Sequence, residues 1–145
     1  MKNIKASILI AFLLLASIGF AQNVKFKDSK VTIDNNQIYT FVKNGSVMTL
    51  ATNLGTEFVS VLTSSYEEKN PAHAKPNGEN FPAMRTVWIY NVKFLQSGRE
   101  MITDMNPRDL IKAIHQSKMV VDEGIMDEEQ LKVFISKYNN ENLKK

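Results

Sequence analysis

His73 and the serines that precede it are the residues whose types could support nucleophilic chemistry. Ser64 or Ser65, His73 and a carboxylate could form a triad in space, because triads are defined by geometry and not by sequence order. However, the chain has no Gly-x-Ser-x-Gly elbow, no Ser-x-x-Lys pair and no cysteine. A small hydrolase with a site built around residues 64–82 is therefore the alternative interpretation, and we predict no catalytic residue.

Metal and cofactor chemistry have little support in the sequence. The two histidines, His73 and His115, are expected on different elements, and a chain without cysteine has no zinc-binding spacing. The glutamate pairs at 67–68 and 128–129 are adjacent in sequence, and the six glycines are scattered. We predict no metal site and no cofactor, and assign His115 to the C-terminal end of a helix, where a positive charge suits the dipole.

Residues 64–82 form the longest stretch without a regular pattern, and they hold three of the four prolines. A segment of this length inside a small domain is either functional or a mobile connection. We favour the mobile connection, with a ligand-contacting loop as the alternative. The side chains that would then contact a partner are Tyr66, His73, Lys75 and Phe81.

An aromatic strand is predicted directly after this loop, over residues 85–94. Alternate positions of a strand share one face, so Trp88, Tyr90 and Phe94 are expected on the same side. Such a row could be a binding platform, but an apolar strand face more commonly packs beneath helices. We therefore expect all three aromatic side chains in the core.

The N-terminus has the three parts of a secretory signal peptide. Lys2 and Lys5 precede an apolar run that ends in Gly19-Phe20-Ala21, which suits cleavage between Ala21 and Gln22. The run is shorter than the about 20 apolar residues of a spanning helix. We therefore expect residues 1–21 to be removed and the mature protein to be periplasmic or secreted, without a membrane span.

The composition of the expected mature chain limits its function. Of the 145 residues, 124 remain, which is enough for a single domain over residues 22–145. Loss of Lys2 and Lys5 leaves sixteen basic and fifteen acidic residues, so the domain is nearly neutral. A neutral domain lacks the basic surface that nucleic acid requires, and without cysteine its stability must come from packing.

Strands are predicted through the first two thirds of the mature chain. Two β-prone runs, at 37–43 and 46–51, are separated by Asn44-Gly45, a pair that suits a two-residue type I′ hairpin. Further short turns separate the other β-prone runs. Strands joined by short turns pair antiparallel, because parallel pairing needs long crossovers.

Two helices are predicted in the last third. Asn106 and Pro107 provide a cap followed by a proline at the first helical position. Asp127 and Gln130 fit a capping box before an apolar stripe at helical spacing. The polar tail at 139–145 is expected to fray.

Together these signals predict an α+β domain, with an antiparallel meander of about five to seven strands covered by two C-terminal helices. The junction Ala21-Gln22 and residues 127–139 resemble small exported bacterial proteins of unknown function, a resemblance that supplies no functional residue. We expect an exported envelope protein that acts as a non-catalytic binding or accessory module. Its expected partner is an envelope protein, lipid or glycan.

Overall fold

The computed structural model describes residues 22–144, so the predicted signal peptide and Ala21 lie outside the described residues. Two α-helices follow seven strands in the chain. The strands are β1 (Val24–Lys27), β2 (Lys30–Ile33), β3 (Asn36–Asn44), β4 (Val47–Thr52), β5 (Glu57–Lys69), β6 (Met84–Phe94) and β7 (Glu100–Thr103). The helices are α2 (Pro107–Ser117) and α3 (Glu128–Tyr138), with short 3-10 turns η1 (Gly78–Asn80), η2 (Asp122–Gly124) and η3 (Glu141–Leu143).

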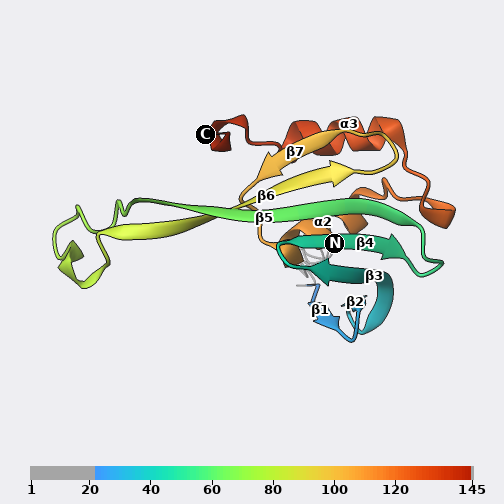
Figure 1. The fold of residues 1–145 in the computed structure, drawn as a ribbon, viewed down its shortest axis with the longest axis horizontal. Helices are drawn as coiled ribbons and strands as arrows, with labels where there is room; N and C mark the ends of the chain where they lie inside the picture. Colours follow the sequence, from blue (N-terminus) through green and yellow to red (C-terminus); the bar gives the residue numbers. More distant parts are fainter. Residues whose placement is uncertain (1–21, 145) are drawn as a thin grey trace, which may run out of the picture.

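The strands form one antiparallel sheet in which each strand pairs with its neighbours in sequence (Figure 1). This arrangement confirms the predicted meander and the α+β class. It follows from the short connections, which return the chain directly alongside the strand it has just left. The register of each pair decides which side chains share a face of the sheet.

The β3–β4 hairpin is confirmed, but its turn lies one residue later than predicted. Asn44 pairs with Val47, so Gly45 and Ser46 are the two loop residues. Gly45 has a φ of 60°, while Ser46 is not in the left-handed region. Glycine at the first loop position is the pattern of a type II′ turn, so the predicted type I′ turn at Asn44-Gly45 was wrong.

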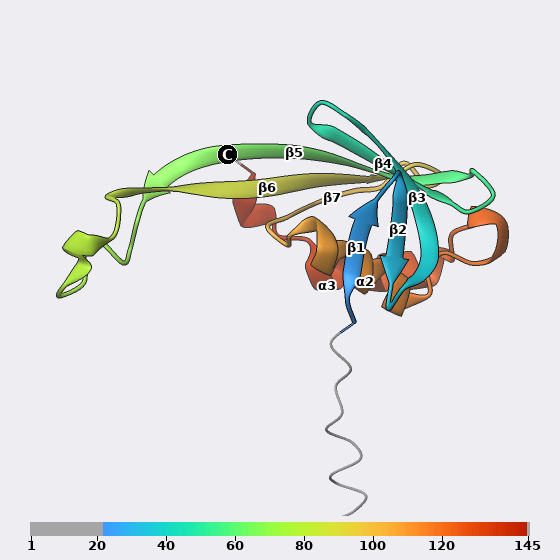
Figure 2. The same cartoon turned by 90° about the horizontal axis from the view of Figure 1, so that it is seen from below.

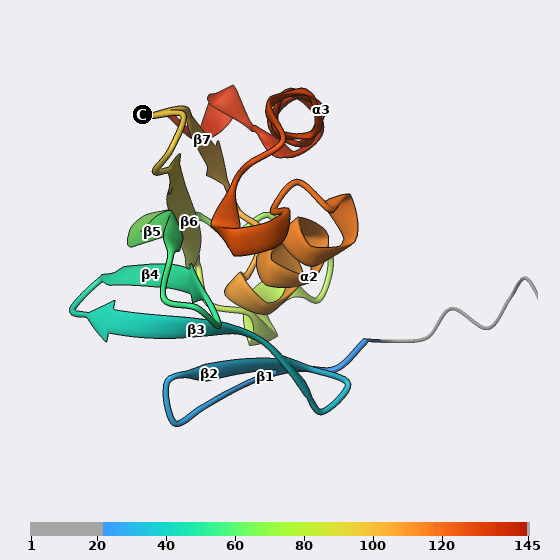
Figure 3. The same cartoon turned by 90° about the vertical axis from the view of Figure 1, so that its right-hand side faces the viewer.

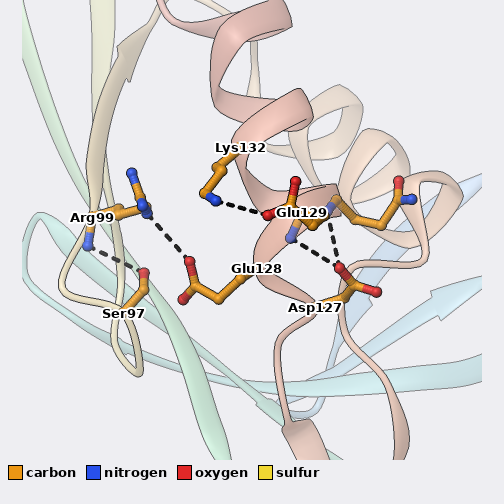
Figure 4. A network of polar contacts seen from close by, with 7 residues as sticks. Ser97, Arg99, Asp127, Glu128, Glu129 and Lys132 are labelled. Atoms are coloured by element: carbon orange, nitrogen blue, oxygen red, sulfur yellow. Dashed lines mark hydrogen bonds and ion pairs between the residues drawn. The ribbon is translucent and has the colours of Figure 1, made fainter.

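Both helices begin at the predicted caps. The Asn106 side chain accepts a hydrogen bond from the Asp109 backbone N–H, and Pro107 follows it. Asp127 Oδ1 accepts from the backbone N–H groups of Glu129 and Gln130, each at 3.0 Å (Figure 4). These caps satisfy N–H groups that the first turn of a helix leaves without partners.

An ion pair links α3 to the turn between β6 and β7. Arg99 Nε lies 3.4 Å from Glu128 Oε2 in the first turn of the helix (Figure 4). Both side chains are about half exposed, so the pair contributes little to the stability of the fold.

Both helices cover the same face of the sheet (Figures 2 and 3). The core between the two layers contains Phe58 and Phe94 from the strands with Leu110, Ile114 and Phe134 from the helices. The rings of Phe94 and Phe134 meet edge to face, with centroids 6.1 Å apart. We call the opposite side of the sheet the open face.

The segment expected to be a loop at 64–82 begins as a strand. β5 continues to Lys69 and pairs residue by residue with β6, from Ser64 opposite Ile89 to Lys69 opposite Met84. The polar run at 64–69 hid this strand, because polar residues at nearly every position remove the apolar alternation that marks a half-buried strand. The connection itself is shorter and covers residues 70–83.

The polar tail, expected to fray, folds back on the edge of the sheet. The Asn140 N–H donates to the Ile102 carbonyl at 2.8 Å, and the Ile102 N–H donates to Asn139 Oδ1 at 2.9 Å. Leu143 is buried further along the tail. The prediction failed because these partners in β7 are far away in sequence, while local polarity alone indicates a free end.

Candidate binding surfaces

The most prominent surface feature is an arm formed by β5 and β6. We define the arm as residues 64–69 and 84–89 together with the connecting residues 70–83. Figure 1 shows the two strands running together well beyond the other strands and both helices. The arm contains all four predicted partner-binding residues, so the structure places them on one projecting element.

These four residues occupy different parts of the arm. Tyr66 lies in β5 and is partly buried, whereas His73, Lys75 and Phe81 lie in the exposed connection at the tip. His73 Nδ1 donates to the Phe81 carbonyl at 2.8 Å, which closes the connection on itself. The histidine therefore has a structural contact within the loop.

The tip is a compact turn. The Asn70 N–H donates to the Ala83 carbonyl at 2.8 Å, which continues the strand pairing into the loop. Gly78 is buried, and a Cβ atom at this position would collide with the carbonyl groups of Ala72 and His73. The sequence of the loop therefore requires glycine where the two sides of the turn meet.

Trp88 departs from the predicted aromatic core row. Tyr90 and Phe94 are buried beneath the helices, but the Trp88 residue is 54% exposed. The prediction that the three side chains share one face of the strand was correct. The prediction that Trp88 is buried was wrong, because the helices end before they reach this part of β6. Met84, on the same face of the arm, is also exposed.

Each strand of the arm has an outer side without a pairing strand among residues 22–144. β4 pairs with β5 only as far as Leu62, and β7 pairs with β6 only as far as Tyr90. Beyond these points β5 and β6 pair only with each other. We call the outer side of residues 84–89 the β6 arm edge.

One ion pair braces the two strands of the arm. Arg85 Nε donates to Glu68 Oε1 at 2.9 Å, and Nη2 of the same side chain contacts the same oxygen. These residues are directly opposite in the register. Opposite charges at such cross-strand positions favour the pairing by a few tenths to about 1 kcal/mol.

A hollow on the open face is the second candidate site. It encloses about 530 Å³ over β5, β6 and β7, a volume within the range of small-molecule sites. Its lining includes Ser60, Leu62, Asn91, Lys93, Glu100 and Ile102 from the strands, with Asn139 and Lys144 from the tail. A smaller hollow, lined by Tyr66 and Ile89 among others, adjoins it and shares Asn91, Ile102 and Lys144.

Potential metal ligands are not clustered in the part of the chain that the structure describes. Residues 22–144 contain no cluster of three or more His, Asp or Glu side chains that could hold a metal ion. His115 lies in the last turn of α2 and contacts the Tyr39 ring, with centroids 6.3 Å apart. Burial raises the pKa of Tyr39 to about 12, which keeps this side chain neutral.

The sequence did not predict two features of these surfaces, namely the exposure of Trp88 and the hollow. The exposure of Trp88 depends on where the helices end, and the hollow depends on a tail that crosses the edge of β7. The arm left a signal on one strand only, because residues 84–89 are β-prone whereas residues 64–69 are mostly polar. No helix within residues 22–144 has the length and apolar character needed to cross a membrane.

Comparisons of the chain with models of known families, with curated proteins and with solved structures gave no match.

Proposed function

We propose that the protein is a non-catalytic binding module of the bacterial envelope that receives an extended segment of a partner protein along the β6 arm edge. The observation that carries this proposal is the unpaired outer side of residues 84–89. An exposed strand edge presents N–H and C=O groups that pair with an added strand. The partner segment would extend the sheet beyond the arm.

The two edges of the arm differ in a way that selects β6. The outer strand at 64–69 carries Glu67, Glu68 and Lys69, and charged residues are the usual means of preventing edge pairing. Residues 84–89 carry only Arg85, whose charge is paired with Glu68. The β6 arm edge is therefore the less protected of the two.

Side chains on both sides of β6 suit an added strand. Met84 and Trp88 share one face of the arm, and Val87 and Ile89 share the other. In strand addition, main-chain hydrogen bonds supply affinity and alternate side chains supply specificity. The partner segment is therefore expected to be β-prone, with apolar residues at alternate positions.

Export is part of the proposal and is supported by the N-terminal sequence pattern. Residues 1–21 have a basic start, an apolar middle and a small-residue junction at Ala21-Gln22. Cleavage would release the domain into the periplasm or the medium. The alternative interpretation as a hydrolase gains no support from His73, whose Nδ1 contacts a backbone carbonyl.

Photo-crosslinking in cells tests the arm directly. A photoreactive phenylalanine analogue at Trp88 is expected to yield a discrete adduct with a second protein. The matched control places the same analogue at Val133, which is 62% exposed on α3 and outside the arm. The control site is expected to give no such adduct.

A pair of lysine substitutions then distinguishes strand pairing at the edge from nonspecific hydrophobic association. Val87→Lys adds a charge next to the arm edge and is expected to abolish the adduct formed from Trp88, whereas Val133→Lys is expected to preserve it. Equal crosslinking from both sites, or an adduct that survives Val87→Lys, would contradict the proposal. So would a hydrolytic activity that is lost on His73→Ala.

A further inference from the structure

We infer that the hollow on the open face is a second binding site, independent of the arm, for a neutral ligand rich in hydroxyl groups, namely a short oligosaccharide. The hollow lies over β5, β6 and β7, and the arm edge is the outer side of another part of β6. The two sites therefore use different surfaces of the molecule.

Unused hydrogen-bonding groups line the hollow. The Ser60 hydroxyl and the Asn91 amide make no side-chain hydrogen bond to the described residues. Serine both donates and accepts, and the asparagine amide offers two donors and an acceptor. A sugar hydroxyl also does both, so each of these groups can be satisfied by the same kind of ligand atom.

The charges at the hollow balance. Lys93 Nζ lies 3.6 Å from Glu100 Oε1, and both side chains are largely exposed. Lys144 Nζ lies at the same distance from Glu141 Oε1. Of the described residues, both lysines that line the hollow are therefore accompanied by an anion, and the rim favours a ligand without net charge. The loose Lys93–Glu100 contact also leaves N–H donors and carboxylate lone pairs for ligand hydroxyls.

The floor of the hollow is apolar between these polar groups. Leu62 and Ile102 line it from β5 and β7, on either side of Asn91. A pyranose ring has apolar C–H faces and a polar equator, and this floor with a polar rim matches both parts. The adjoining hollow shares Asn91 and Ile102 but is also lined by arm residues such as Tyr66 and Ile89, so it is not part of the inferred site.

The tail forms a fixed wall of the site. Asn139 and Asn140 hold it against both backbone polar groups of Ile102. Figure 3 shows the chain passing from α3, across the end of the sheet at β7, to the other side. The hollow therefore exists because the tail is docked, which gives the tail a role beyond covering the edge.

Binding of the purified protein to an array of neutral and charged di- to tetrasaccharides tests the inference. We expect a neutral oligosaccharide to bind, and to shift backbone NMR signals of Ser60, Leu62, Asn91 and Ile102. Asn91→Ala is expected to weaken this binding by about threefold to tenfold, since it removes one or two hydrogen bonds. Lys93→Ala with Asn91→Ala is expected to remove detectable binding.

The controls separate this site from the arm and from misfolding. Asn44→Ala changes the same residue type on an exposed strand end outside the hollow, and is expected to leave binding unchanged. Trp88→Ala is expected to leave it unchanged as well, although it should weaken binding of the partner segment at the β6 arm edge. The inference is overturned if no glycan on the array binds, if charged glycans are preferred, or if Asn91→Ala binds as tightly as the native chain.

Discussion

The two halves of β6 have the same alternation but different environments. Phe94 and Trp88 lie on the same face of one strand, yet Phe94 is fully buried and Trp88 is 54% exposed. The difference comes from what lies opposite: Phe134 of α3 packs against Phe94, while the helices end short of the arm. The strand pattern determines the face of a side chain, and the length of the covering layer determines its burial.

The outer side of β7 and the outer side of the arm part of β6 show a similar contrast. The outer side of β7 is covered by the tail through both backbone polar groups of Ile102. Residues 84–89 of β6 have no comparable cover among the described residues. The tail therefore covers the outer side of β7, whereas the part of β6 that extends beyond β7 keeps an outer side on which a further strand could pair.

The largest expected effect comes from truncating the two aromatic residues of β6. Phe94→Ala should destabilise the protein by about 3–5 kcal/mol, because it leaves a cavity against α3. Trp88→Ala should cost less than about 1 kcal/mol, because much of the ring is already in water. Urea unfolding of both variants checks this. Equal losses in the free energy of unfolding would remove the distinction between the arm and the part of β6 that the helices cover.

The burial of Tyr39 predicts that the free energy of unfolding decreases at alkaline pH. Burial raises the pKa of Tyr39 to about 12 from an ordinary value near 10. Between these values the unfolded chain loses the proton and the folded chain retains it, so stability falls as the pH rises. The contribution is complete below pH 10, and about 2–3 kcal/mol is lost by pH 12.

Tyr39→Phe provides the control for this pH effect. The variant cannot ionise at position 39, so its unfolding free energy should fall less between pH 9 and pH 12 than that of the native protein. All other side chains are the same in both proteins, so the difference between the two profiles isolates the tyrosine. If the unfolding free energies of the two proteins depended on pH in the same way, burial would not raise the pKa of Tyr39.

The covered edge of β7 predicts an intermediate effect. Asn139→Ala removes the acceptor of the Ile102 N–H, and a buried donor without a partner costs about 1–3 kcal/mol. Hydrogen exchange at Ile102 should accelerate. Asn142→Ala, in the same tail, changes a side chain with no such bond and should leave both measurements nearly unchanged. Fast exchange at Ile102 in the native protein would contradict the docked tail.

The smallest expected effect is the coupling of Arg85 to Glu68 in the arm. Both side chains are partly exposed, so a double-mutant cycle with Arg85→Ala and Glu68→Ala should give about 0.2–1 kcal/mol. This coupling should decrease at high salt concentration. A coupling free energy above about 2 kcal/mol would contradict the description of this ion pair as an exposed one.

Much of the fold could be predicted because its signals are local. The Asn106 and Asp127 caps each act within three residues, and the short connections determine the meander. The exact hairpin turn was missed because Asn44, Gly45 and Ser46 allow two turn positions. The register with β4 decides between them, and that register also depends on β5.

The binding surfaces could be predicted only in part, because they depend on distant contacts. Residues 64–82 contain the tip of the arm, but the strand at 64–69 is ordered by pairing with 84–89. The hollow requires Asn139 to meet Ile102, which lies 37 residues earlier in the chain. Neither contact leaves a periodic pattern in the sequence.

Backbone hydrogen exchange of the protein alone, and with the partner captured by crosslinking at Trp88, reports directly on strand addition at β6. Strand addition there predicts new protection at residues 84–89 of β6 and unchanged exchange at 100–103 of β7. Protection confined to α3 or to the open face, with unchanged exchange at 84–89, would contradict strand addition at the β6 arm edge.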